Sequence, residues 1–186
     1  DALGLAIADV GDVIITHLHY DHAGNFGDFP AATFHLQPAE IAYATGPCMD
    51  HGHASHFYEP DDLSSAVRAL YASRLHFCGA DDELAPGLSV HLIGGHTAGL
   101  QVVRVNTARG AVVLASDAAH FYANKAQRNP FPAIHDLDAM LGGYDRLDTL
   151  AGSPERVVPG HDPEVLRIYP RFANAAGIDI ACLHLP

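Results

Sequence analysis

Three histidines and one aspartate stand close together near the start of the chain, in the run His17-Leu18-His19-Tyr20-Asp21-His22. Imidazole nitrogens and carboxylate oxygens together suit zinc, and also manganese or iron. The apolar and β-branched residues 13–16 directly before them are typical of a buried strand. Because strand residues alternate between faces, His17 and His19 are expected to project to the same side. Asp21 and His22 then leave the strand toward a second centre, so the spacing predicts a metal site.

Polar residues of the same kind follow three later segments that are typical of strands. Residues 88–93, 111–115 and 156–158 are rich in apolar and β-branched side chains, and they precede His96, Asp117 and His161, respectively. Each of these three residues alone is more often a cap or a solvated side chain, but together with the first cluster they complete two sites. We expect one ion on His17, His19 and His96, a second on Asp21, His22 and His161, and Asp117 as a bridge between them.

The rest of the chain alternates strand-like and helix-like segments, without an internal repeat or a low-complexity tract. Further strands are expected over 32–37 and 101–106, and helices over 39–43, 60–70, 134–150 and 163–169. Residues 2–8 are typical of the tail of a helix, and residues 45–58 of a loop. This order predicts an α/β sandwich with helices covering the sheets. The length of 186 residues predicts a single domain, 1–186.

Composition and charge narrow the class of partner. The net charge is −12 with only 10 lysine and arginine residues, so the chain lacks the basic footprint of a nucleic-acid-binding protein and would be repelled by an anionic membrane. No stretch of about 18 apolar residues is present to span a bilayer. Cys48, Cys78 and Cys182 are widely spaced and form no CxxC pair, which indicates reduced thiols and a cytoplasmic setting. We therefore expect a neutral small molecule as the partner.

Four motifs, and their order along the chain, resemble those of the metallo-β-lactamase-fold hydrolases. The motifs are His17-x-His19-x-Asp21-His22, Gly95-His96-Thr97, Ser116-Asp117 and Gly160-His161. The longer runs around them, residues 21–25, 95–101, 115–122 and 159–162, resemble the N-acyl homoserine lactonase branch. The resemblance implies a metallo-β-lactamase-like αβ/βα sandwich of mixed sheets flanked by helices. It also implies two divalent metal ions, zinc first among them, and a small-molecule lactone as substrate, with a homodimer as an option.

Two departures from the family pattern lead to further expectations. Members of the superfamily usually begin with several strands before the first histidine motif, whereas only a helix tail is expected here, so part of the first sheet is expected to be missing. The known lactonases carry a substrate-contacting tyrosine three residues after the bridging aspartate. In this chain His120 occupies that position and Tyr122 follows two residues later. We expect one of these two side chains to contact the substrate.

The resemblance implies a specific reaction. A hydroxide held between two metal ions would attack the ring carbonyl of a lactone, and Asp21 would carry a proton to the leaving oxygen. An acyl chain would lie against aromatic side chains near Phe121 and residues 45–60. Alternatives are hydrolysis of another lactone or of a thioester at the same two metals, or a truncated metal-binding fragment without activity.

Overall fold

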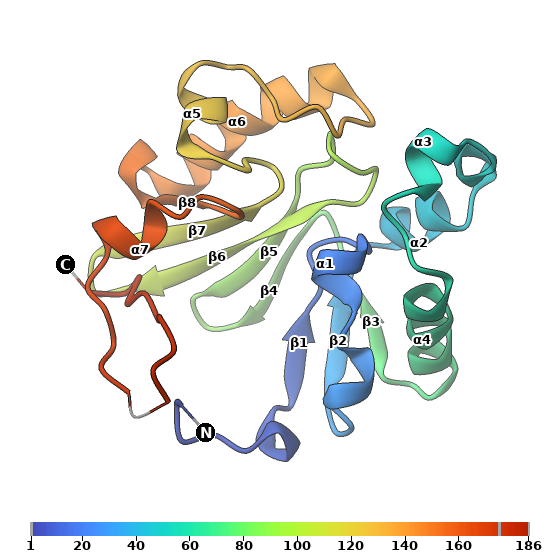
Figure 1. Cartoon of the computed structure of the whole chain (residues 1–186), viewed down its shortest axis with the longest axis horizontal. Coiled ribbons are helices and arrows are strands. Elements are labelled where there is room, and N and C mark those ends of the chain that lie inside the picture. The colour runs from blue at the N-terminus through green and yellow to red at the C-terminus, as the bar shows by residue number, and fades with distance from the viewer. Residues whose placement is uncertain (1, 175, 186) are drawn as a thin grey trace.

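Two β-sheets face each other, and helices cover their outer sides, so that the chain folds into an αβ/βα sandwich (Figure 1). This computed structural model describes residues 2–174 and 176–185. The first sheet contains the parallel strands β1 (Asp12–Ile14), β2 (Thr33–Leu36) and β3 (Leu75–Phe77), in that order. The second sheet follows chain order, with β4 (Asp81–Ala85), β5 (Leu88–Leu92), β6 (Gln101–Thr107), β7 (Gly110–Ser116) and β8 (Val157–Pro159). Its pairs are antiparallel except β7 with β8, which are parallel.

The helices vary greatly in length. The two longest are α4 (Pro60–Tyr71), which begins with proline in its first turn, and α6 (Leu137–Ala151). The Asp136 carboxylate caps α6 by accepting a hydrogen bond from the Ala139 amide, and Gly152 ends the helix with a φ of +67°. The shorter α-helices are α1 (Tyr20–Ala23), α2 (Pro38–Ala44), α3 (Gly52–Ser55), α5 (Tyr122–Ala126) and α7 (Val165–Ile168). Single 3₁₀ turns cover Ile7–Asp9, Phe26–Asp28, Pro47–Asp50 and Pro154–Arg156.

Apolar side chains fill three layers of this sandwich. Phe34 and Leu36 of β2 pack with Ala66 of α4 on the outer side of the first sheet. Val113 and the α6 residue Tyr144 pack on the outer side of the second sheet. Between the sheets lies a third cluster that includes Cys78, Val90 and Val103. The alternation of side chains along each strand supplies both faces of both sheets, so the predicted α/β sandwich is confirmed.

Several expected elements differ from the observed ones. The expected helix tail 2–8 is helical only at its end, where the 3₁₀ turn Ile7–Asp9 begins, and Gly4 before it adopts a φ of +70° that interrupts a helix. The expected loop 45–58 contains a 3₁₀ turn and α3. Strands β3 and β4 were not expected, since their sequences are short or rich in acidic residues. The first sheet is parallel throughout rather than mixed, and it has three strands within the described residues.

Two buried glutamines fasten the two sheets together. The Gln37 side-chain amide donates to the Gly79 carbonyl at 2.8 Å and to the Gln101 side-chain oxygen at 2.9 Å. The Gln101 amide donates in turn to the carbonyls of Ile15 and His35, at 2.9 and 3.0 Å. The backbone amide of Gln101 also donates to the Thr16 carbonyl. These bonds fix the end of the β1 segment against β6, and the first histidine motif begins directly after Thr16.

Two further observations concern the chain as a whole. Cys48, Cys78 and Cys182 are free thiols, as expected. Among the described residues, none of the helices combines the length and apolar character needed to cross a membrane.

The backbone approaches itself closely at Gly99, just before β6. A Cβ atom on this residue would collide with the backbone of Glu40. We therefore expect Gly99→Ala to lower the free energy of unfolding by about 1–3 kcal/mol, measured by urea denaturation. Gly142→Ala is the matched control, because a Cβ there meets nothing within 4 Å and alanine is the better helix former. Equal stability of the two variants would contradict the close approach.

Candidate metal centre

The first histidine motif lies beyond the end of β1 rather than on it. β1 ends at Ile14, so the expectation that His17 and His19 belong to a strand is wrong, and α1 holds Asp21 and His22. The two histidines nevertheless project to the same side, since the Leu18 side chain between them is fully buried in the opposite direction. The Leu18 amide donates to the Glu40 carboxylate at 2.9 Å, which fixes the turn of the chain between the two imidazoles.

Glu40 is fully buried and accepts four hydrogen bonds. Its Oε1 atom accepts from the Leu18 amide and from the Tyr58 hydroxyl, at 2.9 and 3.1 Å. Its Oε2 atom accepts from the Thr97 hydroxyl at 2.5 Å and from the Gly99 amide at 3.1 Å. Burial raises the pKa of Glu40, while the four donors act in the opposite direction by stabilising the carboxylate. One carboxylate thus joins the loop of His17 and His19 to the loop that follows His96.

The His96 loop turns sharply in front of α6. Gly95 has a φ of +86°, and a Cβ there would lie 2.6 Å from the Met140 backbone, so glycine is required on both counts. The His96 Nδ1 atom donates to the Ala133 carbonyl at 2.7 Å. This bond fixes the tautomer and leaves Nε2 directed at His19 Nδ1, 3.0 Å away.

Asp117 lies at the centre of the cluster, directly after β7. Ser116 before it adopts a φ of +46° and shares a hydrogen bond of 2.9 Å with the Thr16 hydroxyl, which ties the ends of β1 and β7 together. The two carboxylate oxygens of Asp117 face different histidines. Oδ2 lies near the Nε2 atoms of His17 (3.7 Å), His96 (3.2 Å) and His120 (3.1 Å), and Oδ1 near those of His22 (3.3 Å) and His161 (3.0 Å).

The charges in the cluster are arranged for binding cations. Burial alone would raise the pKa of Asp117, but the imidazoles of His120, His22 and His96 beside its oxygens hold it far below its usual range. Burial, with help from neighbouring histidines, lowers the pKa of His17 well below its usual value and that of His19 to about 3. These two imidazoles are therefore neutral at physiological pH, which is the form that binds a metal.

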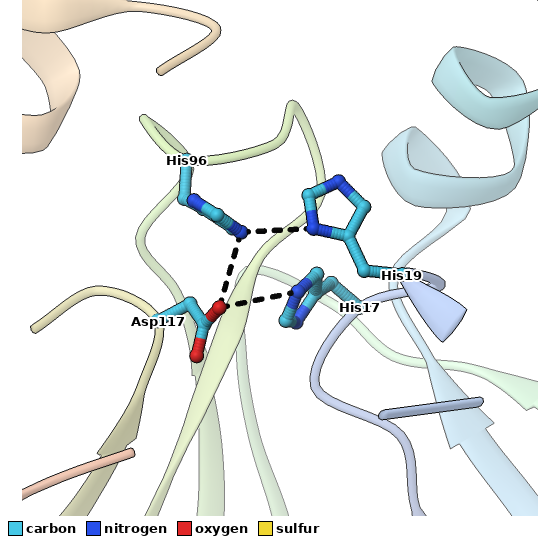
Figure 2. A group of neighbouring side chains, drawn as sticks. All are labelled: His17, His19, His96 and Asp117. Atoms are coloured by element: carbon cyan, nitrogen blue, oxygen red, sulfur yellow. Dashed lines mark hydrogen bonds and ion pairs between the residues drawn. The ribbon is translucent and has the colours of Figure 1, made fainter. Parts of the chain in front are cut away.

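The predicted ligands form two groups of ligand atoms, as Figure 2 shows for the first. His17, His19, His96 and Asp117 make up one group, and Asp21, His22 and His161 the other; within each, the ligand atoms lie within 4.8 Å of one another. Three buried atoms, His17 Nε2, His22 Nε2 and Asp117 Oδ1, have no hydrogen-bond partner in the described part of the chain. Converging lone pairs without donors fit divalent cations, so the cluster is compatible with two metal ions.

The side chains of Asp21, His120 and Tyr122 differ in how they lie relative to this cluster. Asp21 and His120 line the same cavity of about 330 Å³ as His96 and Asp117. The structure does not bring Tyr122 to this cavity. Its amide donates to the Asp162 carboxylate as α5 begins, and its side chain lines a separate cavity of about 440 Å³. We therefore withdraw Tyr122 from the candidate site.

Aromatic side chains form much of the wall around the Asp117 cavity. Phe57, Phe121 and Phe131 line it, and the Phe131 ring stacks on His120 with 4.2 Å between centroids. Phe26, by contrast, is buried in the core beside Phe34. The cavity therefore combines a polar base with an apolar wall.

The role of Glu40 was not predicted from the sequence. It lies in the first turn of α2, directly after β2, within the otherwise apolar helix Pro38–Ala44. The sequence does contain one signal, which is an acidic residue alone among apolar neighbours. A carboxylate buried at such a position requires hydrogen-bond donors, so the residue could have been predicted to hold other segments.

Comparison with known proteins identifies the family of the chain. The family model of the metallo-β-lactamase superfamily matches residues 1–161, and the chain belongs to this superfamily. N-acyl homoserine lactonase AttM of Azorhizobium caulinodans is 32% identical over 185 residues, and the N-acyl homoserine lactonase of Bacillus cereus is 26% identical over 175 residues. The crystal structure of AiiA of Bacillus thuringiensis with N-decanoyl-L-homoserine bound at its active site superposes with a TM-score of 0.71 at 26% identity.

The matched regions differ in extent between the chain and its relatives. The alignments cover 95% of this chain and 66% of AttM, and 91% of this chain and 64% of the Bacillus cereus lactonase. The superposition with AiiA covers 87% of this chain and 60% of that one. The chain thus spans just under two thirds of the length of these relatives.

Glu40 offers a direct test of how the two loops are held. In Glu40→Gln one oxygen becomes an amide donor that faces the donors already present. At least one buried donor then loses its partner, so we expect the free energy of unfolding to fall by about 1–3 kcal/mol and the bound metal to decrease. Urea denaturation and elemental analysis measure the two effects. The exposed Glu59→Gln should change neither, and parity of the two variants would show that Glu40 does not hold the loops.

Asp117 offers a test of the bridge. An amide lacks the negative charge that would let two cations lie close together, so Asp117→Asn should lose most of its bound metal while remaining folded. Elemental analysis and circular dichroism measure metal and fold. Asp28→Asn, at an exposed position, is the control. Wild-type metal content in Asp117→Asn would remove this residue from the proposed ligands.

Proposed function

We propose that the protein is a metal-dependent hydrolase that opens the lactone ring of N-acyl homoserine lactones. The observation that carries the proposal is a single cavity with the Asp117 cluster at its base and phenylalanines along its wall. The similarity to lactonases supports the choice of substrate. One of them, 26% identical with a TM-score of 0.71, was crystallised with N-hexanoyl-L-homoserine bound at its catalytic metal centre.

We assign His17, His19 and His96 to one ion, Asp21, His22 and His161 to the other, and Asp117 to both, with zinc as the metal. Two such ions would supply a bridging hydroxide nucleophile near neutral pH, together with positive charge for the carbonyl and leaving oxygens.

The chain's own groups contribute positioning and proton transfer. The Asp21 side chain is 40% exposed at the edge of the cavity, with Oδ2 3.5 Å from His22 and 3.7 Å from His161. From there it can deliver a proton to the leaving oxygen of the opened ring. His120 lies between Asp117 and Phe131 and lines the cavity, where it can contact the ring of the substrate.

The aromatic wall of the cavity is suited to bind the acyl chain of the substrate. Phe57, Phe121 and Phe131 offer an apolar surface beside the polar base. Each methylene buried there contributes about 0.8 kcal/mol, so longer chains should lower KM until the cavity is full. A neutral substrate also suits a chain with a net charge of −12, which would repel anions.

A panel of N-acyl homoserine lactones, other lactones and thioesters, assayed with the metal-loaded protein, tests the substrate class. We expect ring opening of N-acyl homoserine lactones to be fastest, with KM falling as the acyl chain lengthens. His120→Gln should reduce turnover and retain the bound metal. Much faster cleavage of a thioester or of an unrelated lactone would overturn the substrate class. A metal-loaded protein that cleaves nothing in the panel would favour the fragment without activity.

A further inference from the structure

A second group of histidine and cysteine side chains lies on the inner face of the first sheet. His35 of β2 and His76 of β3 are register partners in the parallel pair, so their side chains share a face. Cys78 follows His76 by two residues and shares that face as well. The three side chains each offer one ligand atom, and these atoms lie within 4.8 Å of one another. The group has no residue in common with the Asp117 cluster.

His35 is held in the manner of a metal ligand. Its Nε2 atom lies 2.8 Å from Asp12 Oδ1, and a carboxylate can only accept, so Nε2 carries the proton. Nδ1 is left with its lone pair. This atom is buried in a side chain that is only 10% exposed, and among the described residues it has no hydrogen-bond partner. A carboxylate on one ring nitrogen and a free lone pair on the other is the arrangement that orients a ligating histidine.

The other two members differ in exposure. The Cys78 residue is only 2% exposed and belongs to the apolar cluster between the sheets. Burial together with Asp82 raises the pKa of its thiol to about 11. His76 is half exposed, which gives a cation a path from solvent. Asp82 Oδ2 lies 3.9 Å from His76 Nε2 and accepts a hydrogen bond from the Gly79 amide. A carboxylate oxygen therefore lies close enough to serve as the fourth ligand.

We propose that His35, His76 and Cys78 form a separate site for one zinc ion, with Asp82 or a water molecule as the fourth ligand. Two imidazoles, one thiolate and one oxygen are ligands that zinc takes in tetrahedral sites. Binding converts the thiol to a thiolate and releases its proton to solvent. The ion would join β2 and β3 to the start of β4, and thereby the first sheet to the second.

Cobalt distinguishes this site from the Asp117 centre, because only this site contains a thiolate. Protein purified from cobalt-supplemented minimal medium should show a near-ultraviolet thiolate-to-cobalt charge-transfer band. Cys78→Ser should abolish the band, whereas Cys48→Ser and Cys182→Ser should retain it. Absence of the band in a wild-type protein that contains cobalt, or its survival in Cys78→Ser, would overturn the proposal.

A second variant avoids the buried cysteine. His76→Gln changes a half-exposed side chain and should fold normally. The variant and the wild type are purified from zinc-supplemented medium and compared by elemental analysis. The variant should contain one zinc equivalent fewer than the wild type. Lactone turnover is expected to remain close to that of the wild type, since the residues of the Asp117 centre are unchanged. An unchanged zinc content would overturn the site, whatever the outcome of the substrate panel.

Discussion

The buried carboxylate of Glu40 holds together the loops that form the Asp117 cavity. The amide between His17 and His19, the hydroxyl after His96 and the amide of Gly99 all donate to it. A buried carboxylate is unfavourable unless hydrogen-bond donors surround it. The three segments therefore pack in the arrangement that places all of these donors around Glu40. The two histidine loops, far apart in the chain, are brought together by the need to satisfy one negative charge.

Asp117 is the second buried carboxylate, and its surroundings are different. Each carboxylate oxygen of Glu40 accepts two hydrogen bonds. In contrast, Oδ1 of Asp117 has no hydrogen-bond partner within the described residues. The groups around Asp117 are imidazoles, and burial lowers the pKa of two histidines of the cluster, His17 and His19. A carboxylate saturated by donors stabilises the fold, and one surrounded by imidazoles, with an oxygen that lacks a donor, is left ready to bind cations.

The sequence alone predicted the sandwich and the side chains that the structure brings together in two groups, because His17, Asp117 and their counterparts each stand next to an apolar strand-like segment. Local patterns could not reveal Glu40, whose role depends on donors 18 to 59 residues away. They also could not show that α5 begins at Tyr122 and directs its side chain to another cavity. Strands such as β4, with the sequence Asp81–Ala85, depend on pairing with a neighbour rather than on their own composition.

The proposed ligands are divided between the two halves of the sandwich. His17, His19, Asp21 and His22 follow the first sheet, whereas His96, Asp117 and His161 follow strands of the second. Neither half alone has a complete set of the proposed ligands for either ion, so release of a cation and separation of the sheets would be coupled. Ions present at about 100 times their dissociation constant would add about 2.7 kcal/mol to the free energy of unfolding for each site. The supply of metal in the surroundings would then set how long the chain survives thermal opening and proteolysis, as well as whether it is active.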